Sequence, residues 1–385
     1  MIIPGPAEVK ELNPRFIISL QILDNSTLDR AYLSGLGGDV REPRDLYRLP
    51  WSFADDPGGR VEVTGRCDLA CPGCRLSPAG DRPLEDVRED VRALRAAAGR
   101  DAITVAGGEP LLYPRLVEVI ELIAREGLKP ILLTNGASLT KGLAAELIRA
   151  GLAEFRLRID SGQRRPDWTG SSEADMNALR ERYANLLWGL GGVRCGFVVV
   201  VRRETLGQIP DILAWCRARM HKVHDLTLIA SPGPDGREIT PDEMLGRLAG
   251  RYPDLEPSAC LEAASPASPF RALVAVSVGG RGGVYGTLGP RTVEIAQVLR
   301  HLIKGRYGLP AMTPRVGRRT FLMAPFDGGV RKTLTNYARS VAKDPLRLFE
   351  SVRAQPVVLG RSSGEPGWGA DLCDGSTAAA VRRNL

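Results

Sequence analysis

The chain has 385 residues, of which 43% are hydrophobic and 25% charged, and its formal net charge is +7. This composition is typical of a globular protein. The sequence has no long apolar run and no signal-peptide pattern, so we expect neither a membrane-spanning helix nor a secretion signal. Seven cysteines, three of them crowded together, argue against a disulfide framework and predict a reducing, cytoplasmic location.

Residues 1–59 are expected to form an N-terminal leader that packs on the rest of the chain. Within it, Phe16–Leu23 is apolar enough for either a strand or a short helix, and its periodicity does not separate the two. Pro43, Pro50 and a turn at Asp55–Gly59 interrupt the remainder.

Residues 60–232 alternate short β-branched runs with helical stretches that each keep one apolar stripe. We expect six strands, at Val61–Thr64, Ala102–Ala106, Pro130–Thr134, Glu154–Ile159, Gly196–Val201 and Leu226–Ala230. Repeated β–α units imply parallel strands with right-handed crossovers, and six are too few for a closed eight-fold barrel. The sequence therefore predicts an α/β fold built on an open, partial (β/α)6 barrel, with chemistry at the carboxyl ends of its strands.

Residues 233–385 are expected to form a C-terminal α+β appendage. Its predicted elements are a helix capped by Thr240, a hairpin of Arg271–Val278 and Val284–Thr287, a helix at Val293–Ile303, and a basic helical stretch at Arg331–Arg353. The basic, apolar-striped part is compatible with contact to a lipid or membrane surface, although an ordinary packed helix is the commoner explanation.

Three cysteines follow the first predicted strand with CxxxCxxC spacing: Cys67, Cys71 and Cys74. Three thiolates on one loop can ligate three irons of a cubane iron–sulfur cluster, and the fourth iron then stays open to a small molecule. A zinc half-site or three unpaired thiols are the alternatives. Zinc normally needs a second cysteine pair or a histidine pair, and all three histidines lie far away in the sequence, so we favour the iron–sulfur cluster.

Polar motifs follow the next three predicted strands. They are Gly107-Gly108-Glu109-Pro110 after the second strand, Asn135 after the third, and Asp160-Ser161 after the fourth. Glycines allow a backbone to approach a ligand closely, and a glutamate carboxylate can bind an ammonium group. The alternatives are an ordinary loop for the glycine motif, a turn residue for Asn135 and a helix cap for Asp160.

Together these motifs resemble those of the radical S-adenosylmethionine (radical SAM) enzymes, and the resemblance covers about residues 60–232. It implies one [4Fe-4S] cluster, ligated by Cys67, Cys71 and Cys74. It also implies S-adenosylmethionine (SAM) bound by Gly107, Gly108, Glu109, Pro110, Asn135, Asp160, Ser161 and Val198. Within that set the family likeness assigns Glu109 to the amino group of SAM, Asp160 and Ser161 to its ribose or carboxylate, and Val198 to the adenine side. Gly73 stands where many members have an aromatic residue, which leaves the packing beside adenine in question.

The resemblance further implies the start of the reaction. SAM would be cleaved reductively to a 5′-deoxyadenosyl radical, which would abstract hydrogen from a small-molecule, peptide or lipid substrate. An electron donor such as flavodoxin or ferredoxin would be a partner. The positive net charge weakly favours an acidic substrate. The sequence has no basic run interleaved with aromatic residues, so we expect no nucleic-acid partner. The alternatives are a non-catalytic iron–sulfur or zinc binding protein, or a decayed paralogue that acts as a partner subunit.

Two further segments bear on substrate and cluster number. Arg164, Arg165 and Trp168 lie in a polar loop after the fourth strand, where they could hold an anionic or planar substrate or simply face solvent. Near the C-terminus, Cys373-Asp-Gly resembles the start of a Cys-Asp-Gly-Cys stretch found in a subgroup of the family, but Ser376 occupies the second cysteine position. We therefore expect a single cluster.

Overall fold

The computed structural model describes residues 46–49, 58–71, 80–96, 102–166, 168, 172–231, 239–262, 270–293, 328–349 and 352–361. Most of the expected leader, including Phe16–Leu23, lies outside this set. So do Cys74, the expected helix Val293–Ile303 beyond its first residue, and the segment around Cys373.

One eleven-stranded sheet organises the described residues. Its path is β1 (Tyr47–Leu49), β8 (Pro257–Glu262), β9 (Phe270–Gly280), β11 (Arg353–Arg361), β7 (Asp225–Ala230), β6 (Arg194–Val201), β5 (Glu154–Arg158), β4 (Lys129–Thr134), β3 (Ala102–Gly107) and β2 (Gly58–Thr64), while β10 (Gly283–Leu288) pairs with β9 alone. Strands β2 to β7 are neighbours in chain order and every adjacent pair is parallel. In the described pairings β1 and β2 end the path without meeting, so the predicted α/β fold with an open, partial barrel is confirmed.

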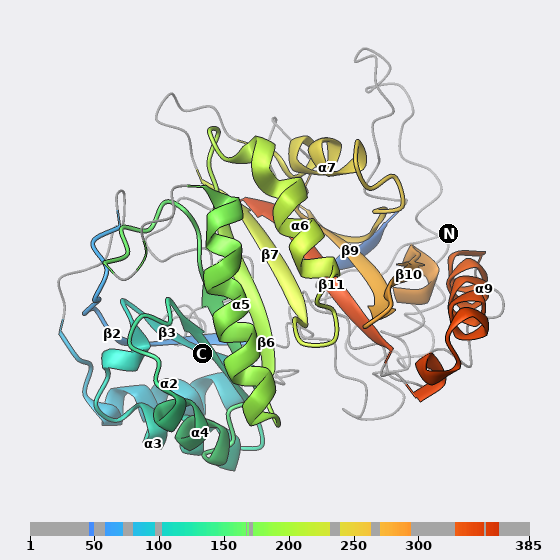
Figure 1. Cartoon of the computed structure of the whole chain (residues 1–385). Helices are drawn as coiled ribbons and strands as arrows, with labels where there is room; N and C mark the ends of the chain where they lie inside the picture. The colour runs from blue at the N-terminus through green and yellow to red at the C-terminus, as the bar shows by residue number, and fades with distance from the viewer. Residues whose placement is uncertain are drawn as a thin grey trace, which may run out of the picture. The chain divides into compact units, whose positions relative to one another are not determined.

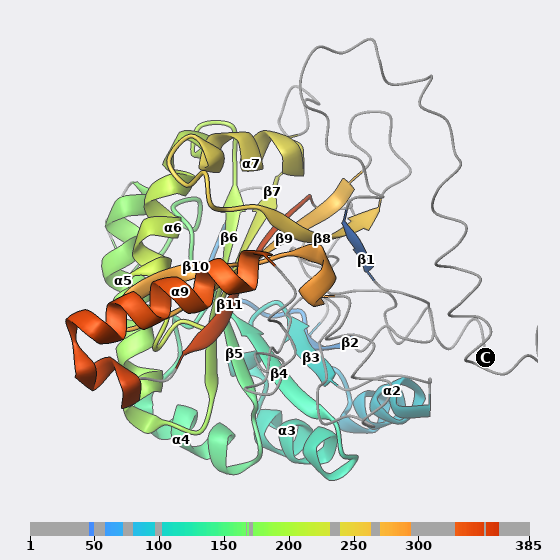
Figure 2. The ribbon, with the colours of Figure 1, turned by 90° about the vertical axis from the view of Figure 1, so that its right-hand side faces the viewer.

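Helices join the parallel strands and cover one face of the sheet (Figure 1). The described helices are α2 (Leu84–Ala96), α3 (Leu116–Arg125), α4 (Lys141–Arg149), α5 (Glu173–Leu190), α6 (Ile209–Arg217), α7 (Pro241–Ala249) and α9 (Gly328–Lys343), with short 3-10 turns η4 (Pro110–Leu112), η5 (Leu206–Gln208) and η7 (Pro345–Phe349). Because side chains alternate along a strand, Phe155 and Phe197 face these helices while Val198 belongs to a separate apolar cluster on the other face. Figure 2 shows α9 alongside β10 on that other side.

All six strands predicted for residues 60–232 are present, and so is the hairpin, as β9 and β10. The expected helix over Arg331–Arg353 is wrong in its second half, because α9 ends at Lys343 and Arg353 begins β11. That strand lies between β7 and β9, parallel to the first and antiparallel to the second. The barrel sheet thus continues into the C-terminal region, and a domain boundary at residue 232 stays a prediction. No described helix has the length and apolarity that a membrane crossing requires.

Candidate functional site

Two of the three loop cysteines face a cleft at the carboxyl ends of the barrel strands. Cys67 and Cys71 line it together with Arg60, Leu69, Gly107, Gly108, Leu133, Thr134, Asn135, Arg158 and Gln163. The cleft is open, and its space of about 430 Å³ includes a part that is open to solvent. The described residues thus bring together two predicted ligands and three of the predicted SAM contacts.

The cysteines outside the loop have a different environment. Cys195, Cys216 and Cys260 are buried in the core, as was predicted for the first two. Burial raises the pKa of the Cys195 and Cys216 thiols, which therefore stay protonated and are poor metal ligands.

The glycine motif packs directly against the start of the cysteine loop. Gly108 N donates to Thr64 O over 2.7 Å, and Glu109 N donates to Arg66 O over the same distance. A Cβ atom on Gly107, whose φ is 142°, would lie 2.3 Å from Thr64 O, and one on Gly108 would lie 2.1 Å from Arg66 O. The glycines were expected to admit a ligand; in addition, they let β3 approach the backbone that leads into Cys67.

We expect Gly108→Ala to destabilise the apo protein by about 3 kcal/mol, because the new methyl group meets a backbone oxygen that cannot rotate away. Urea unfolding measures this loss. Gly246→Ala is the matched control, since its Cβ meets nothing within 4 Å in α7 and it should stabilise by up to about 1 kcal/mol. Equal effects of the two replacements would contradict the close approach described above.

Glu109 joins the end of β3 to the end of β4. Its side chain is fully buried, and Oε1 accepts hydrogen bonds from Leu111 N at 3.0 Å and Thr134 Oγ1 at 2.6 Å. Oε2 accepts one from Asn135 N at 2.7 Å. Burial raises the pKa of Glu109 to about 7, although these three bonds act in the opposite direction. Thr134 and Asn135 line the cleft, so Glu109 supports its wall from behind.

The raised pKa of Glu109 predicts a pH dependence of stability. Because the folded chain binds this proton more tightly than the unfolded chain, the contribution is complete below the ordinary value of 4.5 and is lost as the pH rises through about 7. The free energy of unfolding of the apo protein should fall by about 3 kcal/mol across that window on account of Glu109. Unfolding in urea at a series of pH values should show a flatter dependence for Glu109→Gln than for wild type. Glu118→Gln, which changes a solvent-exposed carboxylate, should leave the slope unchanged, and parallel curves for wild type and Glu109→Gln would contradict the prediction.

Asn135 connects the end of β4 to the cysteine loop. Its Nδ2 donates to Asp68 Oδ1 over 2.7 Å and lies 3.8 Å from Cys67 Sγ, within the longer range of hydrogen bonds to sulfur. Its Oδ1 accepts from Ala137 N at 2.7 Å, and Ser138 Oγ donates to the other oxygen of Asp68 at the same distance. Asp68 is not among the site residues predicted from the sequence.

Asp160 is fully buried, and it contacts both its own segment and Arg202 after β6. It accepts hydrogen bonds from Arg158 Nε at 3.2 Å and from Gly162 N at 3.0 Å, and it pairs with Arg202 at 3.9 Å. It does not cap α5, because Ser172 does so with a capping box. Arg158 rather than Asp160 lines the cleft, which the sequence reading also missed.

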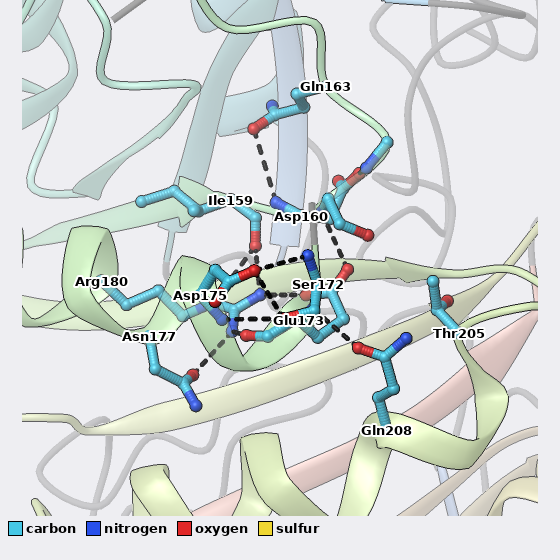
Figure 3. Close-up of polar contacts among 12 residues, drawn as sticks. Ile159, Asp160, Gln163, Ser172, Glu173, Asp175, Asn177, Arg180, Thr205 and Gln208 are labelled. Atoms are coloured by element: carbon cyan, nitrogen blue, oxygen red, sulfur yellow. Dashed lines mark hydrogen bonds and ion pairs between the residues drawn. The ribbon is translucent and has the colours of Figure 1, made fainter. Parts of the chain in front are cut away.

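A buried ion pair holds the segment after β5 in place (Figure 3). Arg180 in α5 bonds to Glu173 at the start of the same helix, and both side chains are fully buried. Arg180 Nη2 also donates to Ile159 O over 2.8 Å, and Ser161 N donates to Glu173 Oε1 over the same distance. The position of Ser161 is therefore set by this pair.

The polar loop that follows is held mainly by its own side chains. Arg165 is buried, and its Nη1 donates to Asn135 O at 2.9 Å and to Gln163 Oε1 at 3.2 Å. Trp168 packs against the core, whereas Arg164 is exposed. Of this loop, Gln163 is the side chain that reaches the described cleft lining. Val198 lies on the same side of the sheet as Leu133, which is part of that lining.

Comparison with known proteins adds three findings. A family model described as "Radical SAM superfamily" matches residues 61–216. The GTP 3′,8-cyclase of Moorella thermoacetica is 32% identical over 241 residues, which are 58% of this chain and 71% of that protein. The probable GTP 3′,8-cyclase of Methanopyrus kandleri is 32% identical over 40% of this chain and 50% of its own.

Solved structures give a more distant likeness. Streptococcus suis SuiB bound to S-adenosylmethionine is 18% identical, with a TM-score of 0.39, over 52% of this chain and 48% of that one. Among other curated relatives, the match covers between 31% and 50% of the relative's own length.

Proposed function

Because this chain belongs to the radical SAM superfamily of enzymes, we propose that its cysteine loop holds the family's [4Fe-4S] cluster and that the adjoining cleft binds SAM. One observation carries the proposal. Cys67 and Cys71 line the same cleft as Gly107, Gly108 and Asn135, which reach it from the ends of two neighbouring strands. Cys74 completes the proposed ligand set from the sequence spacing.

The donor chemistry of the loop fits a metal cluster. Burial, followed by the negative charges of Glu109 and Asp68, raises the pKa of the Cys67 thiol in the metal-free chain. A bound cation offsets those effects and favours the thiolate, which is the form that ligates iron. The two described cysteines are also partly accessible, unlike the buried cysteines of the core.

For SAM, the proposed contacts are those predicted from the sequence. Gly107, Gly108 and Asn135 are supported by their place in the cleft lining. Glu109 is retained as the partner of the amino group, because its Oε2 accepts a hydrogen bond from Asn135 N and a carboxylate oxygen can accept two. Pro110, Asp160, Ser161 and Val198 remain proposed contacts next to that lining.

Held by Cys67, Cys71 and Cys74, the reduced cluster would supply the electron for reductive cleavage of SAM, and hydrogen abstraction from the substrate would follow. The protein's own part is to orient SAM and to exclude water. Flavodoxin or ferredoxin is the proposed electron donor.

For the substrate, an anionic small molecule has the most support among the small-molecule, peptide and lipid classes. Arg60 and Arg158 belong to the cleft lining, and none of its described members is acidic, although each arginine also pairs with a carboxylate outside the lining, Glu62 and Asp160. The relatives named above are GTP 3′,8-cyclases, so GTP is the first candidate to test. Deuterium transfer from labelled GTP into 5′-deoxyadenosine would support it, and SAM cleavage without such transfer would exclude it.

The proposal for the cofactors is tested on anaerobically reconstituted protein. We expect iron and sulfide in equal amounts, a broad iron–sulfur absorption, and release of 5′-deoxyadenosine from SAM on reduction. Zinc without sulfide would instead support the non-catalytic binding protein. A cluster with SAM bound but never cleaved would support the decayed paralogue.

A further inference from the structure

We infer that Asp68 is a positioning residue for the cluster loop: it holds the Asn135 side-chain amide so that one N–H points at the Cys67 sulfur. This inference rests on the proposed function, since it concerns how tightly the loop retains the cluster. It adds to that function a residue that lies between two proposed ligands and is itself not one of them.

The hydrogen bonds around Asn135 fix its amide completely. The side-chain oxygen accepts from Ala137 N, which determines the plane of the amide and which end is nitrogen. One hydrogen of Nδ2 is bound by Asp68 Oδ1 at 2.7 Å. The second hydrogen is then directed toward Cys67 Sγ, 3.8 Å from Nδ2.

Asp68 is itself held from the far side. Ser138 Oγ donates to its Oδ2 over 2.7 Å, so both carboxylate oxygens bond to residues that follow β4. The Cys67 sulfur also accepts a hydrogen bond from Leu69 N at 3.5 Å. The loop is thereby tied to a neighbouring strand end through the residue next to its first ligand.

This arrangement has two chemical consequences for a cluster. Groups that hydrogen-bond to a metal-ligating side chain and orient it typically contribute about 10- to 100-fold to metal affinity. Hydrogen bonds to ligating sulfur and the net charge nearby both act on the reduction potential of an iron–sulfur cluster. An N–H···S bond raises the potential, while the carboxylate charge lowers it, so the two effects of Asp68 can be separated by substitution.

The test compares Asp68→Ala with Asp68→Asn in the reconstituted full chain. The first removes the acceptor that orients Asn135. The second keeps an acceptor oxygen and removes the charge, and the Ser138 hydroxyl can accept from the new amide as readily as it donated. Asp211→Ala is the matched control, because it removes an exposed acidic group on α6.

A chelator should take iron from Asp68→Ala about 10- to 100-fold faster than from wild type, with Asp68→Asn close to wild type and Asp211→Ala unchanged. The midpoint potential should be higher in Asp68→Asn than in wild type, and lower in Asp68→Ala than in Asp68→Asn. Thermal unfolding of the apo proteins shows whether each variant is folded. Wild-type retention of iron by Asp68→Ala, or equal loss in both Asp68 variants, would overturn the inference. Failure of wild type to bind any cluster would instead overturn the proposed function.

Discussion

Replacing Cys71 by alanine is expected to leave a folded protein that no longer assembles a [4Fe-4S] cluster and no longer cleaves SAM. The variant keeps two of the three loop thiolates, so one iron of the proposed cluster loses its cysteine ligand. The buried thiols of Cys195 and Cys216 cannot replace it, because burial raises their pKa and places them in the core. Iron and sulfide analysis, the absorption spectrum and 5′-deoxyadenosine release all measure the loss.

The matched control for Cys71→Ala is Cys216→Ala, which also removes one thiol. Its side chain is fully buried on α6, so the cost should appear as a loss of about 1 kcal/mol in stability. Cluster content and SAM cleavage should be those of wild type. If Cys71→Ala kept its sulfide and its SAM cleavage, the assignment of the loop as the cluster site would be wrong.

The second large effect is expected from Arg180→Met, which should destabilise the apo protein by about 3–5 kcal/mol. The replacement fills much of the same volume but leaves the Glu173 carboxylate buried without its partner. It also removes the donors to Ile159 O. Because Glu173 Oε1 accepts from Ser161 N, weaker binding of SAM should accompany the loss of stability. Urea unfolding and SAM titration measure the two effects.

Two further variants show whether burial is the cause. Arg115→Met removes an arginine of similar size from the exposed pair with Glu118, and it should change stability little because solvent screens that pair. Combining Arg180→Met with Glu173→Leu removes both buried charges and should recover much of the stability lost in the single variant. Equal unfolding free energies for Arg180→Met and Arg115→Met would contradict the assigned role of the buried pair.

The barrel was predictable because its signals are local. Most strands from β2 to β7 are short runs rich in β-branched residues, each followed by a helix, and parallel strands of this kind place their carboxyl ends together. That is how Cys67, Gly108 and Asn135 could be assigned to one site from residues far apart in the sequence. The structure places these three residues in the lining of one cleft, whereas their roles as cluster ligand and SAM contacts stay proposals.

The features that were missed depend on long-range pairing. β11 has a proline at its fourth position and no clear periodicity, so its place between β7 and β9 could not be seen from its own residues. The buried face of α5 was predicted from its apolar side chains, so the burial of Arg180 was not expected. Its burial depends on hydrogen bonds to Glu173 O and Ile159 O, and the sequence alone does not reveal these partners. Asp68 gave no signal because its partners, Asn135 and Ser138, are about seventy positions away.

The place of β11 in the sheet has a consequence for how the chain is made. Its residues are the last strand that the structure describes, yet they pair with β7 on one side and β9 on the other. During synthesis the edges of β7 and β9 stay unpaired until residue 361 has left the ribosome, although both strands were completed long before. Unpaired strand edges invite aggregation, and pairing over such sequence separations is slow. A fragment that stops before residue 353 would keep every proposed ligand and SAM contact but would lack the strand that pairs with β7 and β9, so we expect it to aggregate more readily than the longer chain.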